Sequence, residues 1–151
     1  MATPTSAISY EADRTESRSV PNGAVILLGR LLFAAIFLMS SLGHFSAKMI
    51  GYAASQGVPL AQIAVPASGL LALAGGLSIL IGYKARIGAW MLVLFLIPVT
   101  FMMHKFWGIS DPQAAQMQMI NFMKNMSMLG GALFITQFGA GPASLDARRQ
   151  G

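Results

Sequence analysis

Long apolar runs separated by short polar segments dominate the chain. The runs occupy residues 23–47, 63–82, 87–103 and 117–138. At about 1.5 Å of rise per residue, a helix of about 20 apolar residues crosses a hydrocarbon layer of about 30 Å. The second and third runs contain no charged residue, whereas a helix on the surface of a soluble protein has a polar face. The pattern therefore predicts an all-α, polytopic membrane protein built as a four-transmembrane-helix bundle.

The polar segments at the two ends predict tails on one membrane domain. Residues 1–22 are polar and mixed in charge, and they have too little apolar surface to fold alone, so we expect a flexible tail. Residues 139–151 form the second predicted tail, which leaves 23–138 as the membrane domain. The composition agrees, because 55% hydrophobic and only 10% charged residues exclude both a disordered chain and an ordinary soluble domain.

The basic residues are distributed unequally between the two predicted sides of the membrane. Those in the tails and in the turn between the second and third runs are Arg14, Arg18, Lys84, Arg86, Arg148 and Arg149. The other two loops hold only Lys48 and Lys105. The positive-inside rule then predicts a multi-pass protein of the inner (plasma) membrane with both termini in the cytoplasm. The basic residues that give the net charge of +5 lie near the ends of the predicted helices, so no nucleic-acid partner is expected.

Two features within the runs predict contacts with lipid or with another protein. Ser68, Ala72 and Gly76 are four residues apart and form a face of small side chains that lets a second helix approach closely. Arg30 lies about two turns into the first run, and none of the predicted helices carries an acid. Its charge is expected to meet lipid phosphate or a partner subunit. Membrane lipids and other subunits, or a second copy of the chain, are the predicted partners.

A polar, positively biased group of residues gathers at the predicted outer ends of the helices. Its members are His44, Lys48, His104, Asn121, Lys124 and Asn125. Histidine and lysine donors could bind the carbonyl oxygens of a quinone or the head group of a lipid. The alternative is that these side chains reach toward the membrane interface and bond only to helix ends and water. The sequence alone leaves both interpretations open.

Other site chemistry has less support. The absence of cysteine excludes dithiol chemistry, disulfides, iron–sulfur clusters and thiolate metal sites within the chain. Two histidines could in principle ligate haem, and the eleven methionines could bind copper, but packing explains these residues better and no metal site is predicted. No serine lies in an evident base-and-acid set, so catalytic residues stay unassigned and the chain is not expected to be catalytic alone.

Short motifs in order along the chain resemble the DoxX family of four-helix integral membrane proteins. They are Gly29-Arg30-Leu31-Leu32-Phe33, the segment from His44 to Lys48, Gly57-Val58-Pro59, the segment from Gly75 to Gly82, His104-Lys105-Phe106-Trp107, and the segment from Asn125 to Gly131. The resemblance implies a four-helix bundle associated with membrane redox systems. One departure is that the family often has a glutamate just before the paired glycines, where this chain has Leu71-Ala72-Leu73-Ala74.

Two functions follow from these observations as hypotheses. The first is a small accessory or structural subunit of a larger respiratory or redox assembly in the membrane. The second is a quinone-interacting subunit of a membrane oxidoreductase, with the head-group site at the outer ends of the helices. The direction in which the outer polar residues face distinguishes them, because a cavity favours a ligand and a lipid-facing or protein-facing surface favours a subunit.

Overall fold

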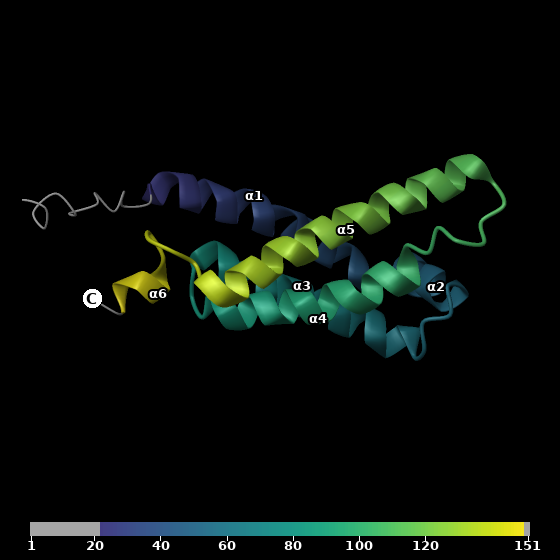
Figure 1. The fold of residues 1–151 in the computed structure, drawn as a ribbon. Coiled ribbons are helices and arrows are strands. Elements are labelled where there is room, and N and C mark those ends of the chain that lie inside the picture. Colours follow the sequence, from purple (N-terminus) through teal and green to yellow (C-terminus); the bar gives the residue numbers. More distant parts are fainter. Residues whose placement is uncertain (1–21, 150–151) are drawn as a thin grey trace, which may run out of the picture.

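The computed structural model describes residues 22–149, and the predicted N-terminal tail lies outside this range except for Asn22. Within it the chain is helical and has no strand, which confirms the predicted all-α class (Figure 1). The elements are α1 (Gly23–Ser41), the 3-10 helix η1 (Leu42–Phe45), α2 (Ala47–Ser55), α3 (Ala61–Ile81), α4 (Ala85–Met103), α5 (Pro112–Phe138) and α6 (Leu145–Arg148).

Three of the helical segments are long and apolar enough to cross a membrane. They are Gly23–Phe45, Ala61–Ile81 and Ala85–Met103, and they coincide with the first three predicted runs. The fourth run falls on α5, which is the longest helix at 27 residues but is less apolar, because glutamine, asparagine and lysine interrupt it. Four transmembrane helices therefore stay a prediction, whereas three apolar helices are present.

Two short helices occupy segments that the hydropathy pattern predicted to be irregular. The expected loop at 49–62 contains most of α2, and the expected tail at 139–151 contains α6. In both helices a serine at the N-cap accepts a hydrogen bond from a backbone N–H: Ser46 from Met49 at 3.2 Å and Ser144 from Ala147 at 3.1 Å. Because short capped helices need no long apolar run, a search for membrane-length segments does not find them.

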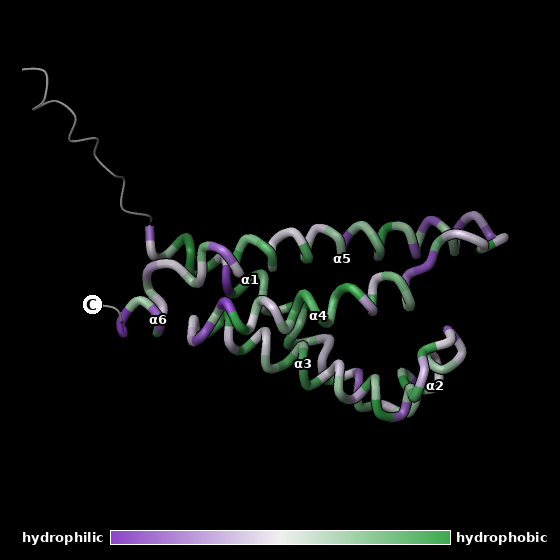
Figure 2. The backbone as a smooth tube through the Cα atoms, turned by 60° about the horizontal axis from the view of Figure 1, so that its bottom comes forward, coloured by the Kyte–Doolittle hydropathy of each residue, from purple (hydrophilic) through white to green (hydrophobic). Residues whose placement is uncertain are grey.

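Among the long helices, α1 packs on α3, α3 on α4 and α4 on α5. In Figure 1, α1 and α5 both lie above the pair formed by α3 and α4. Hydrophobic residues line the middle of the helices and hydrophilic ones concentrate toward the ends and loops (Figure 2). The core is made of apolar side chains from α1, α3, α4 and α5, namely Phe37, Ala72, Ile79, Ala89, Leu92, Val93, Phe95, Leu96 and Ala132.

Glycines set the close approach of α3 and α4. A Cβ added to Gly75 would lie 2.8 Å from the carbonyl oxygen of Gly88 and 2.7 Å from Cδ2 of Leu92. A Cβ added to Gly88 would lie 2.4 Å from the Ser78 hydroxyl oxygen and 3.0 Å from the carbonyl oxygen of Gly75. The two helices thus meet backbone to backbone, as small residues allow in membrane bundles.

The C-terminal segment is attached to the turn between α3 and α4. Asp146 of α6 accepts hydrogen bonds from the N–H groups of Lys84 at 2.8 Å and Ala85 at 3.0 Å, and its own N–H donates to Gly82 O at 2.8 Å. Lys84, the N-cap of α4, has a φ of 49° and no side-chain cap of its own. The Asp146 carboxylate therefore caps α4 from another part of the chain.

Candidate functional site

A cavity of about 480 Å³ lies at the end of the bundle where η1 and α2 are found, enclosed by these two elements and by α1, α3, α4 and α5. It is lined by five of the six residues predicted at the outer ends of the helices, namely His44, His104, Asn121, Lys124 and Asn125. Lys48, the sixth, is exposed on α2 and does not line the cavity. The structure therefore brings residues from η1, α5 and the end of α4 together around one space.

Apolar side chains line the cavity deeper in the bundle. Phe37 lies about two turns before His44, Leu96 lies about two turns before His104, and Met128 lies about one turn beyond Lys124. Phe95 and Val99 of α4 also line it. The cavity therefore has polar groups where the helices end and an apolar wall further in, which is the usual design of a binding pocket for a small molecule.

His44 is held in a defined orientation at this cavity. Its Nδ1 donates to the carbonyl oxygen of Ser40 at 2.9 Å, and its ring packs edge-on against Phe95 with the centroids 5.7 Å apart. Donation from Nδ1 leaves Nε2 of the neutral ring as an acceptor. Gly69 of α3 makes room for this arrangement, since a Cβ there would lie 2.6 Å from the His44 Cβ.

We expect Gly69→Ala to displace His44. The added methyl group meets a Cβ and, at 3.2 Å, the carbonyl oxygen of Ser41, so the backbone of η1 must shift. The imidazole resonances of His44 should move in an NMR spectrum of the detergent-solubilised protein, while those of His104, the other histidine, stay in place. Gly51→Ala is the matched control, because its Cβ would meet nothing within 4 Å. Unchanged His44 resonances in Gly69→Ala would contradict the packing described.

Polar side chains form a stripe along the first half of α5. Lys124 Nζ donates to Asn121 Oδ1 at 3.1 Å, and Asn125 is buried. Lys124 itself is exposed while it lines the cavity, so its ammonium group lies at the mouth. Among residues 22–149 the carboxylates are Asp111, which caps α5, and Asp146 on α6, and neither lines the cavity. The rim of the cavity is therefore cationic.

Two further polar residues belong to this region and were not predicted. His104 Nδ1 donates to Gln118 Oε1 at 2.9 Å, and Gln118 Nε2 donates to the Tyr52 hydroxyl at 3.4 Å. Gln118 could have been found, because it lies three residues before Asn121 on the same helical face. Tyr52 could not, because its helix α2 was expected to be a loop.

The predicted face of small residues on α3 makes contacts within the chain. Ala72 is fully buried, and a Cβ added to Gly76 would lie 3.1 Å from Leu38 of α1. Ser68 lines the cavity and donates to Val65 O at 2.7 Å. These residues let α1 approach α3, so their spacing is explained without a second protein.

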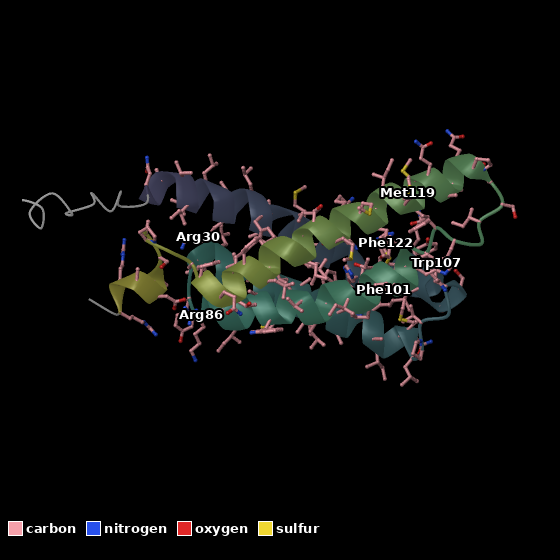
Figure 3. All side chains as sticks on the ribbon, viewed as in Figure 1. Arg30, Arg86, Phe101, Trp107, Met119 and Phe122 are labelled. Atoms are coloured by element: carbon pink, nitrogen blue, oxygen red, sulfur yellow. The ribbon has the colours of Figure 1, made fainter. Side chains whose placement is uncertain are left out.

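Arg30 lies at the other end of the molecule, near α6 (Figure 3). Its side chain is 5% exposed, and its guanidinium group donates to the carbonyl oxygens of Ala140 at 3.4 Å and Ala143 at 2.7 Å. The partners of the charge are therefore backbone carbonyls after the end of α5. The sequence pattern could not predict them, because every residue type has a backbone carbonyl group and none is marked as the acceptor.

Aromatic side chains gather at the end of α4 and the start of α5. Phe122 packs edge-on against Phe101, Phe106 and Trp107, with centroid separations of 5.4, 5.5 and 6.0 Å. Phe101 and Trp107 stay about half exposed, and Figure 3 shows both at this end of the bundle. Exposed aromatic rings at the end of apolar helices are typical of the membrane–water interface.

Comparison with known proteins places this architecture in a family. The sequence model of the SURF4 family matches residues 16–151, which is most of the chain. The chain belongs to the SURF4 family. It is 27% identical over 130 residues to the inner membrane protein YphA of Escherichia coli, covering 82% of this chain and 89% of YphA. It is 31% identical over 127 residues to the inner membrane protein YqjF of the same organism, covering 80% of this chain and 88% of YqjF.

A relative from yeast matches over a shorter length. ERV29 of Saccharomyces cerevisiae, named an ER-derived vesicles protein, is 28% identical over 81 residues, which is 54% of this chain but only 26% of ERV29. No solved structure matches the chain significantly. The chain thus resembles the two bacterial proteins over nearly their whole length and spans about a quarter of the yeast protein.

SURF4 membership corrects two predictions made from the sequence. The assignment to the DoxX family is wrong, because the family model that matches residues 16–151 is that of the SURF4 family. The proposals of a redox-assembly subunit and of a quinone-interacting oxidoreductase subunit are also corrected, because the chain belongs to the SURF4 family and not to the redox-associated DoxX family. The short motifs misled because glycines, a helix-end histidine and apolar neighbours recur in many small membrane bundles.

The prediction of a membrane protein is confirmed. Three apolar helices of membrane-spanning length and the bacterial relatives, both named inner membrane proteins, make this SURF4-family chain a multi-pass membrane protein. Large apolar side chains on the outside of the bundle, such as Leu32, Met39, Leu94 and Phe134, are more than half exposed and contact lipid in that setting.

Proposed function

We propose that this SURF4-family protein binds a single-chain amphiphile with an anionic head group, such as a fatty acid, in the cavity of about 480 Å³. The cavity carries this proposal, because its rim holds Lys124 and two histidines and no carboxylate while its deeper wall is apolar.

Each polar group has a defined part in this proposal. Lys124 at the mouth pairs with the anionic head group, and its bond to Asn121 orients the ammonium. His104 is fixed through Gln118 and Tyr52, and His44 through Ser40, so both rings are oriented before a ligand arrives. The acyl chain then lies against Phe37, Leu96 and Met128. An oriented rim lowers the ordering cost of binding.

We place the protein in the inner membrane with four spans and both termini in the cytoplasm. The names of the bacterial relatives support the membrane, and the basic residues of the turn and tails support the orientation. The described chain begins and ends at the same end of the bundle, where a Cβ on Gly23 would lie 3.3 Å from Ala143. An even number of spans agrees with that arrangement, and α5 is then the fourth span.

Labelling with a photoreactive fatty acid tests the proposed ligand. The purified protein should be labelled on peptides from α2, α4 and α5 that line the cavity. Lys124→Gln should weaken binding about tenfold, because it removes one charge-assisted hydrogen bond from the head group. Lys48→Gln is the matched control, since Lys48 is an exposed lysine at the same end that does not line the cavity.

The control also shows how the proposal could fail. Equal loss in Lys124→Gln and Lys48→Gln would indicate general attraction of anions to a basic surface. Labelling spread over the outside of the bundle in the unaltered protein would show that the cavity is not the binding site.

A further inference from the structure

A second cavity lies between α1 and α5 at the α6 end of the bundle. It has a volume of about 400 Å³ and is lined by Ile26, Gly29, Arg30 and Phe33 of α1, by Ile135 and Phe138 of α5, and by residues 139–141. Its walls are apolar apart from Arg30. It shares no lining residue with the first cavity, so a ligand bound here is independent of the proposed fatty acid.

One side-chain contact between α1 and α5 lies between the two cavities. A Cβ added to Gly131 of α5 would lie 2.8 Å from Cε2 of Phe33, so the ring already rests against the α5 backbone. Phe33 lines the second cavity, and Phe37, one turn further along α1, lines the first. The contact between Phe33 and α5 therefore separates the two cavities, which lie toward opposite ends of the bundle.

Arg30 is incompletely satisfied where it lines the second cavity. Two of its nitrogens donate to Ala140 O and Ala143 O, but Nε is buried and has no hydrogen-bond partner in the part of the chain that the structure describes. The carboxylates of residues 22–149 lie elsewhere, with Asp111 at the start of α5 and Asp146 bonded to the start of α4. A buried N–H group without an acceptor costs free energy, and a nearby anion stabilises a buried cation.

A second guanidinium group, that of Arg86, lies near the lining residue Gly139, although Arg86 does not line the cavity itself. Gly139 lines the cavity, and a Cβ there would lie 3.6 Å from Arg86 Nε. Figure 3 shows Arg30 and Arg86 at the same end of the molecule, near α6. Arginine groups bind phosphate oxygens with oriented hydrogen bonds, and an apolar space between two membrane helices accommodates an acyl chain. An isolated soluble anion would use the arginines but leave the apolar walls uncovered.

We propose that this second cavity binds an anionic phospholipid, with the phosphate close to Arg30 and an acyl chain between α1 and α5. The phosphate balances the charge of the Arg30 side chain. Arg30 thereby has two roles, since it also holds the segment after α5 through Ala140 and Ala143. A bound lipid therefore stabilises the attachment of that segment to α1.

Labelling with a photoreactive phosphatidylglycerol in vesicles, compared with the matching phosphatidylcholine probe, tests this site. We expect labelling on peptides covering 23–33 and 135–141, about tenfold stronger for phosphatidylglycerol. Gly29→Leu should abolish it, because Gly29 lines the cavity and its Cβ would meet nothing within 4 Å, so the new side chain fills space without moving Arg30. Gly130→Leu is the control, since this glycine also has open space at its Cβ but lines neither cavity.

Three further measurements make the outcome decisive. Arg30→Gln should lose the preference for phosphatidylglycerol, and its unfolding midpoint reports any loss of fold. Equal labelling by phosphatidylcholine, or equal labelling of Gly29→Leu and Gly130→Leu, would overturn the proposal. Excess inorganic phosphate should not compete with the lipid; full competition would show a site for a soluble anion instead.

Discussion

Gly75→Val is expected to destabilise the bundle by about 1–3 kcal/mol or more, the range for overpacking a close-packed interior. A Cβ at this position alone would lie 2.8 Å from the carbonyl oxygen of Gly88, and valine adds two further methyl groups. Backbone cannot move aside as a flexible side chain can, so α3 and α4 must separate. Separation exposes Leu92, which is fully buried. Thermal or detergent-induced unfolding, followed by circular dichroism, measures the loss.

Gly130→Val is the matched control for this substitution. Gly130 is also a helical glycine within a predicted span, but its Cβ would meet nothing within 4 Å. The control shares the helix-propensity change and lacks the steric conflict, so its stability should stay close to that of the unaltered protein. If both variants had the same unfolding midpoint, the close contact between α3 and α4 would not contribute to stability.

Asp146→Ala should release the C-terminal segment from the turn between α3 and α4. The carboxylate accepts two backbone hydrogen bonds at the start of α4, and losing such a cap costs about 1–2 kcal/mol. Lys84 and Arg86 are exposed beside this turn, so tryptic cleavage after them should become several times faster. Mass spectrometry of the fragments over time measures the change.

Two other substitutions define what Asp146 contributes. Asp146→Asn keeps one acceptor oxygen, so it should fall between the unaltered protein and Asp146→Ala. Asp111→Ala removes a cap of the same chemistry at the start of α5, where Oδ1 accepts from Gln113 N at 3.1 Å, and should leave cleavage after Lys84 unchanged. Equal acceleration in Asp111→Ala would mean general loosening of the bundle and would refute the specific attachment of α6.

The long apolar helices were predictable because hydropathy over a membrane length is a property of residue types alone. The runs at 63–82 and 87–103 agree with α3 and α4 to within two residues at each end. The position of His44, His104 and Lys124 at the same end of the helices was predictable from the spans, whereas the cavity that they line was left open by the sequence. Lys48 is exposed on α2 and does not line that cavity.

What the sequence could not reveal depends on contacts between distant backbone groups. The partners of Arg30 are carbonyl oxygens, and the cap of α4 is a carboxylate some sixty residues further along the chain. The family was misjudged for a related reason, because short motifs around glycines report how helices pack more than what the protein does. Only the match over residues 16–151 distinguished the SURF4 family from other small bundles.

The bond between Arg30 and the segment after α5 also has a consequence for biosynthesis. Ala140 and Ala143 follow Arg30 by 110 and 113 positions, so most of the 151-residue chain is translated between the guanidinium group and its acceptors. The first helix is therefore made before the carbonyl acceptors of its arginine exist. A chain that ends before residue 140 lacks both acceptors, so its Arg30 side chain needs water or lipid in their place.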